Sequence, residues 1–407
     1  MIKITNVVIV GAGTGGLSTA RELSKNSEVK ITIIEKGPLL EVEDSYKCYT
    51  PWDNSELELL RTELVGGSSL VIAGNFTESL VEQLKEHEID ITPQLEQLKD
   101  EIGIQTMPET HKGPITRLLE KSATELGLET HPMPKGINPE NCVQCGKCAW
   151  GCPHNAKWNS LSDLEVALEN GATLITNEQV TKLVVEDNKI KAVTTDKART
   201  YPADVVVLAA GGLVTPKLLR TAGINAGNSL AVDPFVTIGG YYKNARQDHE
   251  IQMNTFIKFP KMVISPHTSQ YLLPKIQQTH PDATVDDIIS FMIKVPDKTN
   301  GKITGESVSK YIDHDDASLI AQGCGIATAI LVNAGADIKS ISSTQVRGAH
   351  LISSAKIGEV VDSNLECEVK NLYVADGSVL PEAPGLPPIY TILALSRRLG
   401  QYLSQKY

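Results

Sequence analysis

Two kinds of hydrophobic pattern alternate along the chain, and each predicts a different kind of sheet. Residues 4–13 (ITNVVIVGAG) and 203–212 (ADVVVLAAGG) are continuous apolar runs that end in glycines, as strands buried on both faces do. Residues 14–26 and 215–223 follow these runs with helical spacing, and residues 29–37 (VKITIIEKG) return to a strand pattern. This order of strand, glycine-rich turn, helix and strand predicts a βαβ unit with a parallel sheet.

From about residue 239 to residue 343 the apolar positions alternate with polar ones. Three such segments predict half-buried antiparallel strands, and residues 296–306 (PDKTNGKITGE) predict a turn between two strands. Residues 318–336 (SLIAQGCGIATAILVNAGA) predict one mostly buried helix. The alternating segments are residues 253–259, 261–266 and 290–295.

The two patterns divide the chain into interleaved parts. We expect an α/β fold, with a Rossmann-like nucleotide-binding domain built from discontinuous segments and an α+β substrate domain around an antiparallel sheet. The nucleotide-binding domain takes residues 1–76, 155–238 and 344–407, an insertion with helices and cysteines takes 77–154, and the substrate domain takes 239–343.

Composition and charge narrow the setting in which the protein works. The formal net charge of −11 argues against a nucleic-acid partner, because such partners favour basic surfaces. The first residues run straight into a strand pattern, so we expect no signal peptide, and no apolar run reaches the roughly 20 residues of a membrane span. Four of the seven cysteines fall in one short window, which does not suit a disulfide framework. We therefore expect a cytoplasmic protein with no transmembrane segment.

The first glycine-rich turn predicts a dinucleotide site. Gly11, Gly13 and Gly16 form G-x-G-x-x-G between an apolar strand and a helix, where glycines allow a tight turn and close approach to a pyrophosphate. The start of the helix supplies N–H donors for the phosphates. Glu35 ends the next strand, at the place of an acidic residue that binds ribose hydroxyls and disfavours a 2′-phosphate. The pattern therefore favours FAD or NAD over NADP.

Four longer blocks of sequence decide between these cofactors. They are residues 7–24, 66–75 (GGSSLVIAGN), 205–219 and 371–400, and the last is the most specific. In that order they resemble blocks of the glucose–methanol–choline flavoenzyme family and cover about half of the chain.

The resemblance implies FAD, with its pyrophosphate at Gly11 to Gly16 and its adenosine ribose at Glu35. Some family members attach the flavin covalently through a histidine near the GGSS segment. Leu70 and Val71 stand there in this chain, so we expect non-covalent FAD. The other residues that the resemblance brings to the cofactor are Gly67, Ser68 and Asn75 along the flavin, Val180 at the adenine, and Asp376 and Gly377 at the pyrophosphate–ribityl end.

The resemblance also implies a catalytic base. Family members transfer a hydride from a CH–OH carbon to the flavin while a histidine takes the hydroxyl proton. His350 opens HLISSAKIG, which falls on the family's H-x-x-G-T-x-x-x-G-like segment, although Ser353 and Ser354 replace its Gly-Thr pair. An imidazole suits this task because its pKa lies near working pH.

One family position is changed. The second catalytic residue is usually His or Asn, in a G-x-N-P-x-x-T-like motif, and here GLPPIYT puts Pro387 in its place. The ring of proline can neither donate nor accept the hydrogen bond with the substrate hydroxyl group that this position implies. Tyr390 is the nearest polar substitute, but its place at the start of an apolar helix predicts a core residue.

The run CVQCGKCAWGCP predicts a metal-binding loop. Its cysteine spacing of two, two and three residues before a proline is typical of an iron–sulfur ligand run. The candidate ligands are Cys142, Cys145, Cys148 and Cys152, for a 4Fe–4S or 3Fe–4S cluster. Distant Cys48, Cys324 or Cys367 are alternatives for the fourth ligand, and His154 is expected at the surface.

Two other interpretations of this loop stay open. Zinc also takes four thiolates, but more often from two C-x-x-C pairs that a longer loop separates. Some family members carry a similar loop as plain structure, with reduced cysteines.

These observations predict an FAD-dependent dehydrogenase that takes a hydride from a CH–OH group of an organic alcohol. Electrons would leave through an iron–sulfur cluster to a one-electron acceptor, either an electron-acceptor protein or a quinone. The alternatives are a flavin reductase of a C=C or C=O bond, and a flavin and iron–sulfur electron-transfer subunit. The electron-transfer subunit stays an alternative because Pro387 stands where the family has its second catalytic residue.

Overall fold

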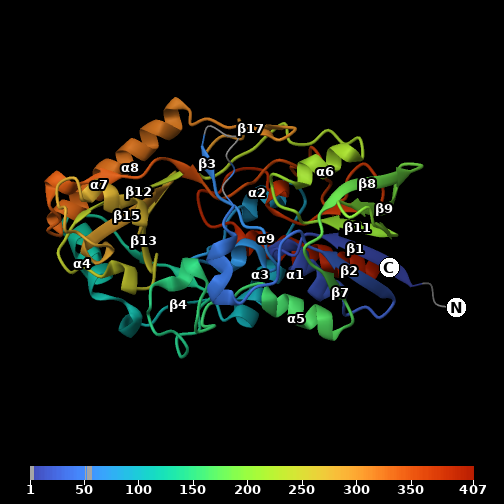
Figure 1. The fold of residues 1–407 in the computed structure, drawn as a ribbon, viewed down its shortest axis with the longest axis horizontal. Helices are drawn as coiled ribbons and strands as arrows, with labels where there is room; N and C mark the ends of the chain where they lie inside the picture. The colour runs from blue at the N-terminus through green and yellow to red at the C-terminus, as the bar shows by residue number, and fades with distance from the viewer. Residues whose placement is uncertain (1–3, 51, 53–56) are drawn as a thin grey trace.

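The computed structural model describes residues 4–50, 52 and 57–407, and it places a parallel sheet at one end of the molecule and an antiparallel sheet at the other (Figure 1). The parallel sheet has the strand order β20-β11-β1-β2-β7. This sheet confirms the predicted α/β class and its Rossmann-like half. Its strands are β1 (Thr5–Val10), β2 (Val29–Ile34), β7 (Thr173–Ile175), β11 (Val205–Leu208) and β20 (Leu372–Val374).

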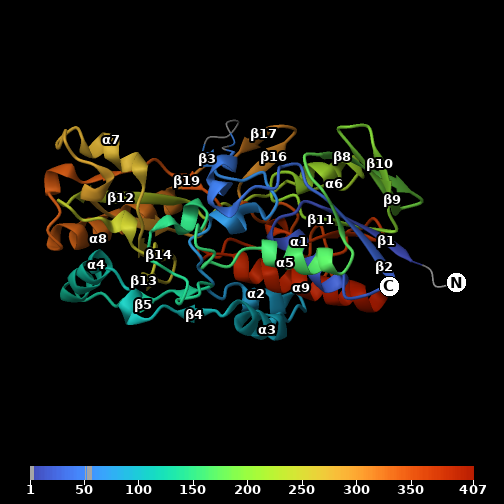
Figure 2. The ribbon, with the colours of Figure 1, turned by 60° about the horizontal axis from the view of Figure 1, so that its bottom comes forward.

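Both faces of the parallel sheet are covered, which explains its continuous apolar runs. Figure 2 shows α1 (Thr14–Leu23), α5 (Leu161–Glu169) and α9 (Ile389–Lys406) together along one face. Leu17 of α1 and Leu399 of α9 share one buried core with Leu183 and Val193 of a small antiparallel sheet. That small sheet consists of β8 (Val180–Glu186), β9 (Lys189–Thr195) and β10 (Thr200–Pro202), and α6 (Thr215–Thr221) packs beside it.

The second large sheet is mainly antiparallel, as predicted. Its order is β3-β19-β12-β15-β14-β13-β5, and β18 pairs with β12. The central strands are β12 (Phe235–Tyr241), β13 (Thr255–Phe259), β14 (Met262–Pro266) and β15 (Ile288–Lys294). The flanking strands are β3 (Glu58–Leu59), β5 (His131–Pro132), β18 (Ser342–Ser343) and β19 (Arg347–Gly348). Because β3 and β5 come from distant parts of the chain, the sheet draws on more than residues 239–343.

Short helices and strands complete the chain. Helix α3 packs against α9, and α4 begins where Glu250 accepts hydrogen bonds from the N–H groups of Ile115 and Thr116. These elements are α2 (Val81–Glu86), α3 (Thr92–Ile102), α4 (Pro114–Glu125), α7 (Leu273–Ile276), β4 (Gln105–Thr106) and β6 (Pro134–Lys135).

Two predictions about the substrate half were wrong in detail. Residues 296–306 are more than a turn, because β16 (Lys302–Thr304) pairs there with β17 (Ser307–Ser309) as a separate hairpin. Helix α8 (His314–Asn333) is buried on one face only, where Ile320, Ala327 and Ile330 meet the antiparallel sheet. The other face carries small residues, which gave the whole stretch an apolar pattern and led to the prediction of a mostly buried helix. Within the described residues, α8 is the one helix long and apolar enough to cross a membrane by length and composition alone.

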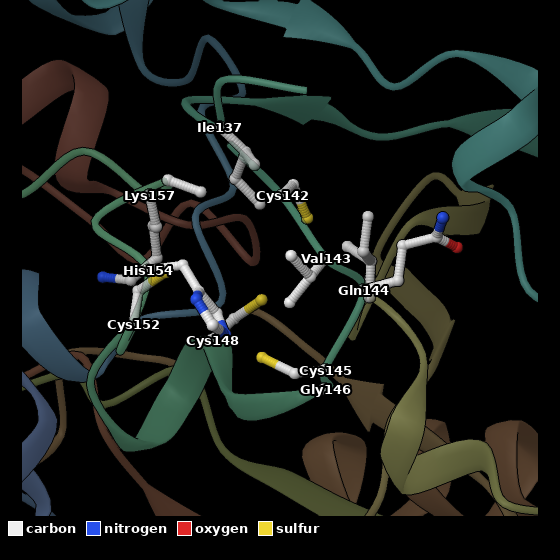
Figure 3. A pocket seen from close by; sticks show the side chains of 12 residues that line it. Ile137, Cys142, Val143, Gln144, Cys145, Gly146, Cys148, Cys152, His154 and Lys157 are labelled. Atoms are coloured by element: carbon white, nitrogen blue, oxygen red, sulfur yellow. The ribbon is translucent and has the colours of Figure 1, made fainter. Parts of the chain in front are cut away.

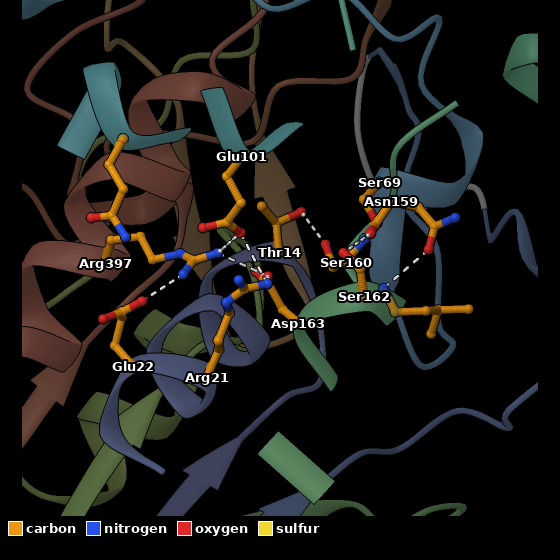
Figure 4. A network of polar contacts seen from close by, with 12 residues as sticks. Thr14, Arg21, Glu22, Ser69, Glu101, Asn159, Ser160, Ser162, Asp163 and Arg397 are labelled. Carbon is orange, nitrogen blue, oxygen red and sulfur yellow. Dashed lines mark hydrogen bonds and ion pairs between the residues drawn. The ribbon is translucent and has the colours of Figure 1, made fainter. Parts of the chain in front are cut away.

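A buried ion network holds the helices of the nucleotide-binding half together (Figure 4). The guanidinium of Arg397 on α9 lies 2.5 Å from Glu22 of α1, 2.9 Å from Asp163 of α5 and 2.7 Å from Glu101 of α3. Arg21 adds a second cation to Glu101 and Asp163. Removing one partner of such a buried network leaves charges without compensation.

We expect Arg397→Met to lower the free energy of unfolding by about 3–5 kcal/mol, because Glu22 and Asp163 would lose the buried cation that they share and keep only Lys25 and Arg21. Urea denaturation followed by circular dichroism measures the change. Lys85→Met is the control, since its pair with Glu82 is exposed and contributes little to stability. Equal losses in the two variants would contradict the prediction.

Candidate active site

The glycine-rich turn leaves an open space at the start of α1. A Cβ atom at Gly11 or Gly16 would collide with neighbouring backbone, and Gly11 has a φ of +100°, so both positions require glycine. Gly13, the residue before α1, has nothing within 4 Å of the position of a Cβ atom. This space lies where the N–H groups at the start of a helix favour a phosphate.

Glu35 is buried beside this turn. Its two carboxylate oxygens accept hydrogen bonds from the N–H groups of Ala12 (2.8 Å) and Gly37 (2.7 Å). Burial raises the pKa of Glu35, while these two backbone donors act in the opposite direction. The backbone N–H of Glu178 donates to the carbonyl of Glu35 at 3.1 Å, which brings nearby Val180 to the same edge of the sheet.

The GGSS segment lies directly on the glycine-rich turn. The N–H of Gly66 donates to the carbonyl of Ala12 at 2.8 Å, and the backbone of Gly67 packs against Gly13. Ser68 is exposed, whereas Asn75 at the other end of the segment is buried.

Asp376 and Gly377 lie at the end of the neighbouring strand, β20. The carboxylate of Asp376 accepts hydrogen bonds from Gly211 N–H (2.8 Å), the Thr215 hydroxyl (2.5 Å) and Ser378 N–H (2.8 Å). Because β1, β11 and β20 are adjacent and parallel, the structure brings these residues and the first glycine-rich turn to one edge of the sheet. In such folds dinucleotides bind in a crevice outside the carboxyl ends of the strands.

His350 belongs to a chain of three ionisable side chains at the junction of the two sheets. Its Nδ1 lies 2.8 Å from Oδ2 of Asp233, and its Nε2 lies 3.3 Å from Nζ of Lys294. Asp233 precedes β12 and its second oxygen accepts the N–H of Gly385 at 2.8 Å, while Lys294 is the last residue of β15. The imidazole therefore has an anion on one side and an amine on the other.

Burial lowers the pKa of His350, Lys294 lowers it further, and the hydrogen bond and charge of Asp233 oppose both. The imidazole is therefore neutral at pH 7, and its Nε2 can accept a proton. Burial also lowers the pKa of Lys294 to about 8, against the charges of Asp233 and Asp297.

The position that Pro387 occupies gains no hydrogen-bonding group from its neighbour Tyr390. Tyr390 is 2% exposed, its hydroxyl donates to the carbonyl of Leu95, and its ring packs against Phe76. The prediction that Tyr390 is a core residue is confirmed. Ser354 donates to the carbonyl of Gly212 at 2.6 Å, and Ser353 is buried.

The four cysteines of the run line one small cavity (Figure 3). Cys148 and Cys152 are buried, Cys142 and Cys145 are partly buried, and the exposed His154 lies at the rim. Among the described residues, no three of these sulfurs lie within 4.8 Å of one another. The three other cysteines do not line the cavity: Cys48, Cys324 and Cys367.

Two buried lysines connect this cavity to the segment 66–75. Lys157 lines the cavity, and its Nζ donates to the carbonyls of Ser69 (2.7 Å) and Leu70 (3.2 Å). Lys135 is fully buried, and its Nζ donates to the side-chain oxygen of Asn75 at 2.5 Å. In the described part of the chain neither ammonium forms an ion pair with a carboxylate. Burial lowers the pKa of Lys135 to about 7 and that of Lys157 to about 8, while negative charge on the neighbouring thiols acts in the opposite direction. A nearby anion would therefore favour the charged forms of both lysines.

Sequence reasoning missed four side chains of this region: Asp233, Lys294, Lys135 and Lys157. A signal existed for Lys294, because it interrupts the apolar strand pattern SFMIKV. The other three follow irregular segments, where no periodicity marks a buried charge.

Two family models described as GMC oxidoreductase match residues 6–239 and 315–396. Uncharacterized protein MJ1450 of Methanocaldococcus jannaschii is 31% identical over 96% of this chain and 97% of its own length. Long-chain-alcohol oxidase FAO1 of Arabidopsis thaliana is 24% identical, over 98% of this chain and 67% of its own length.

Solved structures share the fold. Pyridoxine 4-oxidase from Mesorbium loti matches with a TM-score of 0.72 at 15% identity, over 99% of this chain and 100% of that chain. Formate oxidase of Aspergillus oryzae RIB40, in its R554A form, matches with a TM-score of 0.73 at 16% identity, over 100% of this chain and 99% of that chain.

We expect Asp233→Asn to move the pKa of His350 further below its ordinary value, because the carboxylate is the group that stabilises the imidazolium. Histidine ring signals followed by NMR through a pH titration measure the shift. Asp286→Asn is the matched control, because Asp286 faces the exposed His249 and should leave His350 unchanged. A His350 pKa that rises in Asp233→Asn would contradict this electrostatic account.

Proposed function

The chain belongs to the GMC oxidoreductase family, and from this premise we propose that it is an FAD-dependent dehydrogenase of an organic alcohol. The reaction takes a hydride from the CH–OH carbon and a proton from the hydroxyl group, which leaves a carbonyl product. The plant relative named as a long-chain-alcohol oxidase supports a substrate of the lipid-alcohol kind.

The observation that carries the proposal is the His350 site. A neutral imidazole whose Nδ1 is held by Asp233 at 2.8 Å carries its lone pair on Nε2, the atom that can accept the hydroxyl proton beside the amine of Lys294. Asp233 then stabilises the imidazolium that forms, as a buried carboxylate does beside a catalytic histidine. A subunit that had lost its own substrate chemistry would have no need of this arrangement.

The crevice at the strand ends fits FAD. Open space at Gly13, N–H donors at the start of α1 and the buried carboxylate of Glu35 suit a pyrophosphate followed by a ribose. FAD, when bound, supplies the acceptor for the hydride. The family resemblance implies that Gly67 and Asn75 lie along the flavin.

We further infer that the cysteine cavity binds an iron–sulfur cluster. Zinc at about 2.3 Å from each thiolate would draw sulfurs to about 3.8 Å from one another, whereas no three of these sulfurs lie within 4.8 Å of one another among the described residues. An anionic, thiolate-bound cluster would favour the charged forms of Lys135 and Lys157, which would in turn offset its negative charge.

A cluster at this place would connect the enzyme to its electron acceptor. It passes electrons singly, whereas FAD takes two as a hydride, so its partner would be a one-electron acceptor protein or a quinone. The contacts of Lys157 and Lys135 with the segment 69–75 support a short distance between cluster and flavin.

We expect His350→Ala to slow anaerobic reduction of FAD by a long-chain primary alcohol by roughly 10²–10⁴-fold, because the hydroxyl proton loses its acceptor. Stopped-flow absorbance of the flavin measures the rate. His249→Ala serves as control, since His249 is exposed. A rate indifferent to His350→Ala would remove His350 as the base.

We expect the protein, purified without oxygen, to hold about four irons and matching sulfide per FAD, because four thiolates surround the cavity. Metal and sulfide analysis, with EPR spectra before and after dithionite, measures this. Cys145→Ser should lose the cluster signal and Cys324→Ser should keep it. Full FAD content without iron would contradict the cluster and leave the hydride chemistry in place.

A further inference from the structure

The family position held by Pro387 leaves His350 without a partner for the substrate hydroxyl. A proline ring offers no donor or acceptor there, and the polar group nearest in sequence, Tyr390, is committed to the carbonyl of Leu95. Alkoxide character that develops on the substrate oxygen needs a donor at this place.

Lys294 supplies a donor from another element. It ends β15 in the antiparallel sheet, and its Nζ lies 3.3 Å from Nε2 of His350, the atom that must face the hydroxyl group. Among the described residues no carboxylate pairs with it, although its side chain is only 7% exposed. A buried ammonium with donors to spare is costly unless a ligand uses them.

The geometry of this pair suits one oxygen atom. With the two nitrogens 3.3 Å apart, an oxygen at about 2.6–3.2 Å from each completes a triangle. The same oxygen can then give its proton to Nε2 and accept a hydrogen bond from Nζ.

We propose that Lys294 is the second catalytic residue, in place of the side chain that Pro387 lacks. Its ammonium donates a hydrogen bond to the substrate oxygen while Nε2 of His350 takes the hydroxyl proton. The C–H bond breaks with its electron pair leaving as hydride to the FAD of the proposed function, and the C=O bond forms. Lys294 keeps its proton throughout. This role rests on the proposed function.

The charges around Lys294 set its pH range. Asp233 lies behind His350, and burial lowers the pKa of Lys294 to about 8. The ammonium is therefore present below about pH 8 and lost above it, while His350 is neutral above its own lowered pKa. Among the described residues, the other charged or titratable groups around Lys294 are His267, Asp297 paired with Lys310, and Arg347 paired with Glu58.

We expect Lys294→Met to slow anaerobic reduction of FAD by a long-chain primary alcohol by about 10²–10³-fold, the usual loss when one donor to a developing oxyanion is removed. The rate of the natural enzyme should fall above about pH 8, and this alkaline limb should disappear in Lys294→Met. Lys294→Arg should recover part of the rate and move the alkaline limb to higher pH. If Lys294 had only a structural role, the alkaline limb would stay at the same pH in both variants.

Lys258→Met is the matched control, because Lys258 is exposed on β13 of the same sheet. Lys294→Met should keep its FAD content and unfold no more easily, since it removes an unpaired buried charge. A Lys294→Met rate within twofold of the natural enzyme, alongside a slow His350→Ala, would overturn the role of Lys294 and leave the proposed function intact. An enzyme whose FAD no alcohol reduces would overturn both.

Discussion

The carboxylate of Asp233 ties together parts of the chain that must meet for the site to exist. One oxygen holds Nδ1 of His350, and the other holds the N–H of Gly385, in the segment that leads to Pro387. Asp233 itself has a φ of +46°, a left-handed conformation that is unfavourable for most residues. Its N–H donates to Asp297 at 2.9 Å. The strained residue is thus held in place by a second buried carboxylate.

That second carboxylate depends in turn on a cation. Asp297 lies 2.6 Å from Lys310, and both side chains are fully buried. Lys310 directly follows β17, the second strand of the hairpin found where we expected only a turn. The orientation of His350 therefore depends on a residue outside the family motifs, Lys310, which lies beside the β16–β17 hairpin.

Much of the fold could be predicted because its signals are local. Continuous apolar runs reflect strands buried on both faces, and alternation reflects strands buried on one face. Glycine-rich turns mark where the buried strands end, so both sheets were recognisable. The cysteine run was recognisable for the same reason, since its spacing lies within one short loop. Asp233, Lys294, Lys135 and Lys157 could not be predicted, because each acquires its role from residues distant in the chain. The exposed face of α8 was not predicted, because alanine and glycine count as apolar in a sequence pattern even where they are exposed.

The Arg397 network affects how the chain folds during its synthesis. Glu22 of α1 and its cation Arg397 are separated by 375 positions, so α1 is synthesised long before the helix that neutralises it. Until α9 arrives, the face of α1 that packs on α9 is uncovered and Glu22 has only Lys25 as its cation, and closing so long a loop is slow. The nascent chain thus presents an exposed βαβ unit for most of its translation, a state on which chaperones act.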